Sequence, residues 1–411
     1  MRHSLSRICW RLALLAAVGC APVDTSPEVS GERRPAAATA SRPASPEAQD
    51  GDPVQQRIRA AIEHCRRREL LTTNGFWTVF HGILGLGPSL TLTDPDSGRK
   101  VNALEYISSG GELRGLRFFP TRWGLDVQMG PPFVGQGHQD QFIAEMAQWG
   151  IRPDHPFRVN GQSYTFADFV RHAQMRAKTT ATDPPQELSW AIIVIAQYVG
   201  IDAEWTNEDG ERLTLVDCVR YEMQQPIETA ACGGTHRLFG LRWVHHLHLQ
   251  RGGKTEGLWK ELDDQQRKYQ ALARKWQNAD GSFSTEFFTG PGNAQDMQRR
   301  INTSGHILEW LALSLDDQQI REPWVEQAAN AVAMMFLEIQ NQPMEGGSLY
   351  HAAHGLLMYY ARRYDADWLG PNRPLIMLPT GPFGGPILEH QGLAQEPADS
   401  PRPARPSSGQ N

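Results

Sequence analysis

A short motif built around histidine recurs along the chain, and it constrains the fold more than any other feature. Each copy is a turn followed by a histidine and then by an apolar stretch of helical period. In the clearest copy, residues 231–241, two glycines and Thr235 precede His236. The histidines that lead these stretches are His81, His138, His236, His306 and His354, and Glu187 takes the same place in a sixth copy. Helices are therefore expected to begin near these residues, for example over 305–315 and 351–363.

The copies recur at intervals of about fifty residues, and a further helical segment precedes each of them. Six units of two helices predict an all-α fold, an (α/α)6 toroid of six helical hairpins in which an outer ring of helices surrounds an inner ring. A linear α-solenoid is the structural alternative, and the repeat number of six favours closure. The domain is expected to cover 53–370, with a small irregular or β insertion near 91–135 that holds a β-hairpin around 113–127.

The N-terminal sequence, residues 1–19, predicts export. Basic residues occupy the first positions, a short apolar stretch covers 12–18, and Gly19 and Cys20 follow. The apolar stretch is too short to span a bilayer as a helix. Its ending resembles the lipobox of bacterial lipoproteins, which implies that Cys20 is lipidated and anchors an exported protein to a membrane of the cell envelope. An ordinary signal peptide that is cut nearby is the alternative.

Segments poor in apolar residues flank the expected domain. Residues 20–52 are rich in Pro, Ala, Ser and Glu, and 395–411 have a similar composition. Such segments cannot bury enough apolar surface to fold, so a disordered linker after Cys20 and a disordered tail are expected. Pro and Gly dominate 371–394, which is expected to be extended.

Charge and cysteine content exclude some classes of function. The net charge is −6 and the pI is about 6.2, which gives no electrostatic basis for binding nucleic acid. Beyond the N-terminal segment only Cys65, Cys218 and Cys232 remain, and no two of them form a C-x-x-C pair. This pattern excludes a dense disulfide framework and a cysteine-rich zinc ribbon. Cys232 lies beside the clearest copy of the motif and could act as a nucleophile or a ligand, but the expected role is that of a small buried apolar residue.

Helical period predicts which side chains line the middle of the ring. Residues three, seven and ten positions after each leading histidine share its face, and the opposite face is apolar. Buried polar groups are costly unless they are hydrated or hydrogen-bonded, so a water-filled central cavity is expected. The alternative is that each histidine only bonds a neighbouring carbonyl. The residues predicted to line the cavity are His81, His138, Gln141, Glu145, Glu187, Trp190, Phe239, Trp243 and His354, together with His236, His306 and Glu309.

One further motif suggests a relationship. The run from Gln277 to Phe283, with Gly281 between them, resembles the QW motif of the terpenoid cyclase and protein prenyltransferase superfamily. The resemblance implies an α/α toroid over residues 54–365. The motif occurs once and has Phe in place of Trp. The acid motif of the squalene cyclases is absent and the zinc ligands of the prenyltransferases are not recognisable, so neither activity is carried over.

Metal binding is one chemistry that five histidines suggest. Adjacent pairs such as His306 with His354, or His81 with His138, could share an ion across neighbouring helices. The sequence has no H-E-x-x-H or comparable spacing. It therefore assigns no metal site and identifies no cofactor.

Acid–base chemistry on a glycan or another polymer outside the cytoplasm is the second chemistry that the sequence suggests. Carboxylates and aromatic faces in one cavity are typical of carbohydrate sites, which suggests a glycan-processing hydrolase or lyase by analogy of fold. The expected catalytic residues are His236, His306 and Glu309, with the Glu309 carboxylate orienting His306 as a general base and Trp243 offering a stacking surface. The alternative is a non-catalytic lipoprotein that binds a ligand or partner, so the sequence leaves open whether the protein is an enzyme.

Overall fold

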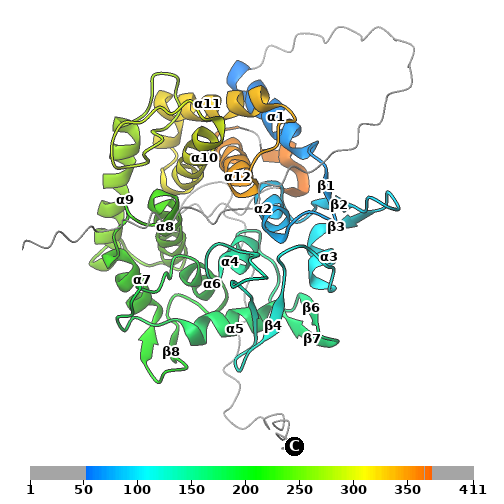
Figure 1. The fold of residues 1–411 in the computed structure, drawn as a ribbon. Helices are drawn as coiled ribbons and strands as arrows, with labels where there is room; N and C mark the ends of the chain where they lie inside the picture. Colours follow the sequence, from blue (N-terminus) through cyan, green and yellow to red (C-terminus); the bar gives the residue numbers. More distant parts are fainter. Residues whose placement is uncertain (1–51, 365, 373–411) are drawn as a thin grey trace, which may run out of the picture. The chain divides into compact units, whose positions relative to one another are not determined.

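The structure is a computed structural model and describes residues 52–364 and 366–372. Several predicted features lie outside the described residues, namely the signal peptide, the lipidation site Cys20, the linker up to residue 51 and the tail 395–411. So does the predicted extended segment 371–394, apart from its first two residues. In the described part the fold is mostly helical, as predicted (Figure 1).

Twelve α-helices are present in the part of the chain that the structure describes. The odd-numbered helices are α1 (Pro53–Arg66), α3 (Ala103–Ser108), α5 (Phe166–Arg176), α7 (Leu215–Gln224), α9 (Leu258–Lys275) and α11 (Pro323–Ile339). The even-numbered helices are α2 (Phe76–Leu86), α4 (Gln141–Ala147), α6 (Ala191–Tyr198), α8 (Thr235–Gln250), α10 (Met297–Ser314) and α12 (Gly346–Arg363). Three short 3₁₀ helices are η1 (Ala231–Gly234), η2 (Gln319–Arg321) and η3 (Ala366–Asn372).

The even-numbered helices contact one another in a closed cycle. Each packs against the next, from α2 to α12, and α12 packs against α2 although the two lie far apart in the sequence (Figure 1). The odd-numbered helices pack against even-numbered ones, and α1 also packs against α11. The chain therefore alternates between two sets of helices, one of which closes on itself.

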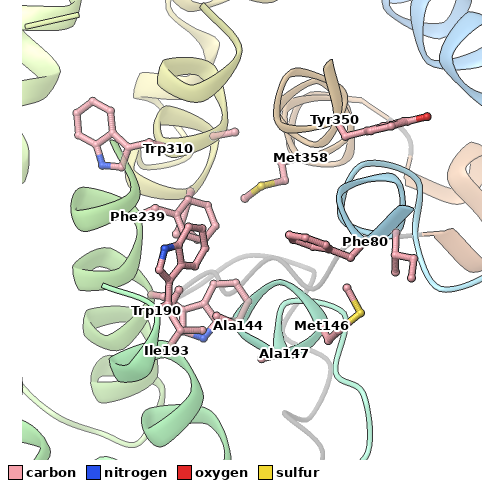
Figure 2. Close-up of a cluster of buried hydrophobic side chains, with 14 of the residues drawn as sticks. Phe80, Ala144, Met146, Ala147, Trp190, Ile193, Phe239, Trp310, Tyr350 and Met358 are labelled. Atoms are coloured by element: carbon pink, nitrogen blue, oxygen red, sulfur yellow. The ribbon is translucent and has the colours of Figure 1, made fainter. Parts of the chain in front are cut away.

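The two sets of helices differ in how much of their surface is buried. Helix α1 buries Ile58, Ala61, Ile62 and Cys65, which is one stripe at helical spacing, whereas all eight residues of α6 are buried. A helix with one apolar stripe covers a core, and a helix that is apolar all round lies inside it. Every even-numbered helix contributes to the cluster of buried apolar side chains in Figure 2, which includes Phe80, Met146, Ile193, Phe239, Trp310 and Met358.

Small β-sheets form in the connections between helices. Strands β1 (Leu70–Leu71), β2 (Thr91–Thr93) and β3 (Lys100–Asn102) form one sheet, and three hairpins are formed by β4 (Phe118–Pro120) with β5 (Leu125–Val127), β6 (Pro156–Val159) with β7 (Gln162–Thr165), and β8 (Glu204–Thr206) with β9 (Arg212–Thr214). The hairpin predicted around 113–127 is confirmed as β4–β5. Strand structure is not confined to 91–135, however. Asn160 and Gly161 both have positive φ between β6 and β7, and this Asn-Gly turn is a hairpin signal that the prediction missed.

The predicted helix starts at 305 and 351 are wrong, and His138 and Glu187 lie before α4 and α6 instead of at their starts. Helix α10 begins at Met297 and α12 at Gly346, so His306 and His354 lie in the middle of their helices instead of the first turn. The cause is local capping. The Asp296 carboxylate accepts a hydrogen bond from the Arg299 amide, and the Glu345 carboxylate accepts from the Gly347 and Ser348 amides, which starts each helix before the histidine.

Within the described ranges, none of the helices combines the length and the hydropathy that crossing a membrane requires.

Candidate functional site

The even-numbered helices and the loop before α4, which holds His138, bring five histidine rings together in the interior. The His236 ring lies 4.9 Å from that of His138, 5.1 Å from that of His306 and 5.3 Å from that of His351, measured between centroids. The His351 ring is also 4.2 Å from His306 and 5.2 Å from His81. All five are buried. These rings, together with Cys232, Glu145, Glu187, Glu309 and His354, are called the histidine cluster below.

Hydrogen bonds at Nδ1 fix the orientation of most of these rings. Nδ1 of His81 lies 2.8 Å from the Trp77 carbonyl oxygen, and Nδ1 of His306 lies 2.7 Å from the Asn302 carbonyl oxygen. A carbonyl oxygen only accepts, so Nδ1 carries the hydrogen in both rings and Nε2 keeps its lone pair. Metal-binding histidines are held in the same way, with one nitrogen donating to a carbonyl or carboxylate and the other facing the ion.

Glu309 holds two further histidines. One carboxylate oxygen lies 2.8 Å from Nδ1 of His351 and the other lies 2.7 Å from Nδ1 of His354. Burial opposes ionisation of Glu309, but these two histidines hold its pKa below the ordinary value. The predicted pairing of Glu309 with His306 is wrong. The two residues share a face of α10, but the carboxylate reaches across to α12.

His236 differs from the other members of the cluster. It is 5% exposed, and neither Nδ1 nor Nε2 has a hydrogen-bond partner among the described residues. A neutral imidazole offers one donor and one acceptor, and leaving both unpaired in the interior costs free energy. The ring is surrounded by His138, His306 and His351, and Trp190 lies 4.8 Å from it.

Glu145 is a buried carboxyl group with two histidines beside it. Its Oε1 lies 3.4 Å from Nε2 of His81 and 4.0 Å from Nε2 of His351, and it accepts a hydrogen bond of 3.0 Å from the Gln141 amide. Its Oε2 has no partner in the described part of the chain. Burial raises the pKa of Glu145 well above the ordinary value, and a cation beside the carboxylate would oppose this shift.

The side of the cluster nearest to solvent is formed by Glu187 and Cys232. Nδ1 of His138 lies 2.8 Å from the Glu187 carboxylate, whose side chain is 31% exposed. Burial opposes ionisation of Glu187, but His138 lowers its pKa below the ordinary value. Cys232 is partly buried and has a left-handed φ of 49°, an uncommon conformation for a residue with a side chain.

Three histidines of the cluster are neutral at physiological pH. Burial lowers the pKa of His81 and of His236 well below the ordinary value, and neighbouring histidines lower both further. Burial also lowers the pKa of His306 to about 3, with His351 as the next cause. Each neutral ring keeps a nitrogen lone pair that a metal ion can bind.

Three groups of side chains in the cluster have the geometry of metal ligands. They are Cys232 with His236 and His306, His138 with Glu187 and His236, and His81 with Glu145 and His351. In each group the ligand atoms lie within 4.8 Å of one another. Imidazole nitrogen, carboxylate oxygen and thiolate sulfur are the donors that zinc and similar ions take in proteins.

The predicted aromatic platforms are buried in the core. Trp190 is 2% exposed, Trp243 is fully buried and Phe239 is 5% exposed, with the Phe239 and Trp243 rings stacked on each other at 6.0 Å. Trp190 and Phe239 are seen among core side chains in Figure 2. A shallow depression lies beside β5, where Asp126 and Asp140 contribute to its lining. It has no enclosed space for a water molecule, and no member of the histidine cluster lines it.

The structure places all five histidines predicted from the repeat in the histidine cluster. It also places there His351, which was not predicted. His354 is linked to His351 through the Glu309 carboxylate and lies 6.0 Å from the Trp149 ring, whereas His351 contacts three other histidine rings. His351 lies one helical turn before His354 on the same face, so the H-A-A-H run marked both residues equally. Cys232, expected to be a small buried residue, is within ligand distance of His236 and His306.

Comparison of the chain with protein-family models, with curated proteins and with solved structures finds no match. The chemistry of the histidine cluster is therefore argued from its geometry alone.

Proposed function

We propose that the chain is a metal-binding protein that holds a divalent transition-metal ion of the zinc class on His236. The observation that carries the proposal is the buried His236 ring, whose two nitrogens have no partner among the described residues while three histidine rings surround it. An ion on His236 would replace an unpaired polar group by a metal–ligand bond.

Two sets of further ligands are available to such an ion. Cys232 and His306 form one set, and His138 and Glu187 form the other. Either set gives three protein ligands, which leaves a coordination position for water or for another molecule. Both sets lie on the side of the cluster where Glu187 reaches solvent, which offers a path for the ion to enter.

We propose further that the helices form an (α/α)6 toroid with this ion near its axis. The support is the closed cycle of contacts among the six even-numbered helices, each of which is preceded by an odd-numbered helix. The likeness to the terpenoid cyclase and prenyltransferase superfamily remains a proposal of fold that rests on the run from Gln277 to Phe283.

The geometry favours ion binding over the glycan-processing alternative. Stacking of a sugar ring needs an accessible aromatic face, and Trp190, Phe239 and Trp243 are buried. The function supported best is therefore a narrowed form of the ligand-binding alternative, in which the ligand is a metal ion. His236 and His306 act as ligands in this proposal, and Glu309 positions His351.

Replacement of His236 with glutamine tests the proposal. The purified protein, stripped with a chelator, is expected to bind Zn²⁺ in equilibrium dialysis, and His236→Gln is expected to weaken binding by more than about 10-fold because a direct ligand is lost. His248→Gln is the matched control, since His248 lies near the end of the same helix and outside the cluster. Binding of Zn²⁺ by His236→Gln at wild-type affinity, or no binding by the wild type, would refute the proposal.

We also propose that the protein is exported and anchored to the cell envelope through lipid on Cys20, on the strength of the N-terminal sequence. Expressed in a bacterial host, the wild type is expected in the membrane fraction and Cys20→Ser in the soluble fraction, because a lipid chain supplies the membrane affinity. Cys9→Ser leaves Gly19 and Cys20 intact and serves as control. Equal partitioning of the wild type and Cys20→Ser would exclude the anchor.

A further inference from the structure

Three acceptor atoms converge at the buried end of the histidine cluster. They are Nε2 of His81, Nε2 of His351 and Oε1 of Glu145, which lies 3.4 Å from the first and 4.0 Å from the second. The three residues come from α2, α12 and α4 and are at most 3% exposed. They share no member with the two groups that contain His236.

Hydrogen bonding fixes which atoms face this point. Nδ1 of His81 donates to the Trp77 carbonyl, and Nδ1 of His351 donates to the Glu309 carboxylate. In the neutral form of each ring, Nε2 is then a bare acceptor, so two lone pairs face a carboxyl oxygen. A cation placed between these three atoms would be bound by all of them.

The neighbouring donors are too few for these acceptors. The Gln141 amide lies 3.1 Å from Nε2 of His81 and 3.0 Å from Oε1 of Glu145. The second carboxyl oxygen, Oε2 of Glu145, is buried and has no hydrogen-bond partner among the described residues. An ion at this point would displace the Gln141 amide from His81 and could also take the unpartnered oxygen.

We infer that His81, Glu145 and His351 form a second metal site, so that the cluster holds two divalent ions. This inference rests on the proposed function, because it assumes that the first ion binds at His236. Two imidazoles and one carboxylate make a ligand set suited to zinc, iron(II) or cobalt(II). The His351 ring lies 5.3 Å from the His236 ring, which makes the two sites neighbours.

The charges of the cluster suit two ions. The carboxylates of Glu145, Glu187 and Glu309 and the thiolate of Cys232 supply four negative charges when ionised, which equals the charge of two divalent cations. Ions buried in a low-dielectric interior need such compensation nearby. Glu309 contributes through His351 and His354, whose Nδ1 hydrogens it accepts, and so acts as a positioning residue.

The number of ions bound per chain tests the inference. The chelator-stripped chain is equilibrated with Zn²⁺ or Co²⁺, separated from unbound ion and analysed for metal content. The wild type is expected to bind two ions and Glu145→Gln one, because the amide cannot replace the carboxylate as an anionic ligand. Glu338→Gln, a change at an exposed position of α11, is the control and is expected to bind two.

The possible results separate the two proposals. One ion in the wild type, lost in His236→Gln, would overturn the second site and leave the proposed function standing. No ion in the wild type would overturn both. Two ions in both the wild type and Glu145→Gln would show that the second ion is not held by this group. If Glu145→Gln does not fold, as judged by its helical circular dichroism, the wild-type count decides.

Discussion

Replacing Glu222 with alanine is expected to lower the free energy of unfolding by about 3–5 kcal/mol, because it leaves a buried charge without its partner. Glu222 is fully buried on α7. Its carboxylate accepts hydrogen bonds from Nε of Arg237 at 2.8 Å, from the Leu188 amide at 3.1 Å and from the Ser189 hydroxyl. In the alanine variant the Arg237 guanidinium, which is 8% exposed, loses its bond to the carboxylate and retains, among the described residues, the bond to the Pro226 carbonyl.

Urea denaturation followed by circular dichroism measures this effect. Glu338→Ala, at an exposed position of α11, is the matched control and is expected to change stability by less than about 0.5 kcal/mol. If the free energy of unfolding of Glu222→Ala lies within about 1 kcal/mol of the wild-type value, the pair contributes little to stability. The contact also bears on the site, because Leu188 follows Glu187 and Arg237 follows His236 in the chain.

Replacing Gly305 with alanine is expected to lower the free energy of unfolding by about 1–3 kcal/mol, because the added methyl group has no space between two closely packed helices. Helices α10 and α12 cross closely at Gly305. A Cβ there would overlap the Ala352 side chain and lie 2.7 Å from its Cα and 3.0 Å from its backbone nitrogen. Backbone atoms cannot rotate away, so the helices must separate.

Separation of these helices should also weaken Zn²⁺ binding, since it displaces His306, a proposed ligand on α10, and moves Glu309 away from His351, the ligand on α12 that it positions. We expect Gly305→Ala to lower affinity by about 10- to 100-fold, the range found when residues behind metal ligands are changed. Gly290→Ala is the control, because a Cβ there would have no atom within 4 Å. Unchanged stability and unchanged Zn²⁺ affinity in Gly305→Ala would contradict the packing argument.

Much of the helical architecture follows from patterns that are local in sequence. The apolar period and the turns between segments predicted twelve helices in six pairs, and twelve α-helices are present in the described part of the chain. Helix starts were less predictable where a capping residue lies far upstream of the histidine. Asp296 and Glu345 each satisfy backbone amides through their side chains, but nothing in the apolar pattern marks them as caps.

The site was harder to predict because its bonds run between helices. Sequence period placed Glu309 on the face of His306, but the bond that forms depends on the distance to α12, which only packing sets. The same holds for the ligand groups, in which His81, Glu145 and His351 come from three separate helices. No short motif can encode such a group, which is why the sequence assigned no metal site.

The position of a bound ion tests the central claim most directly. Crystals of the protein equilibrated with Zn²⁺ would give anomalous difference peaks at the zinc absorption edge. We predict a peak about 2.0–2.1 Å from a ring nitrogen of His236, the usual zinc–nitrogen distance, and a second peak among His81, Glu145 and His351. Peaks confined to histidines outside the cluster, such as His64 and His248, with none at His236, would contradict the account.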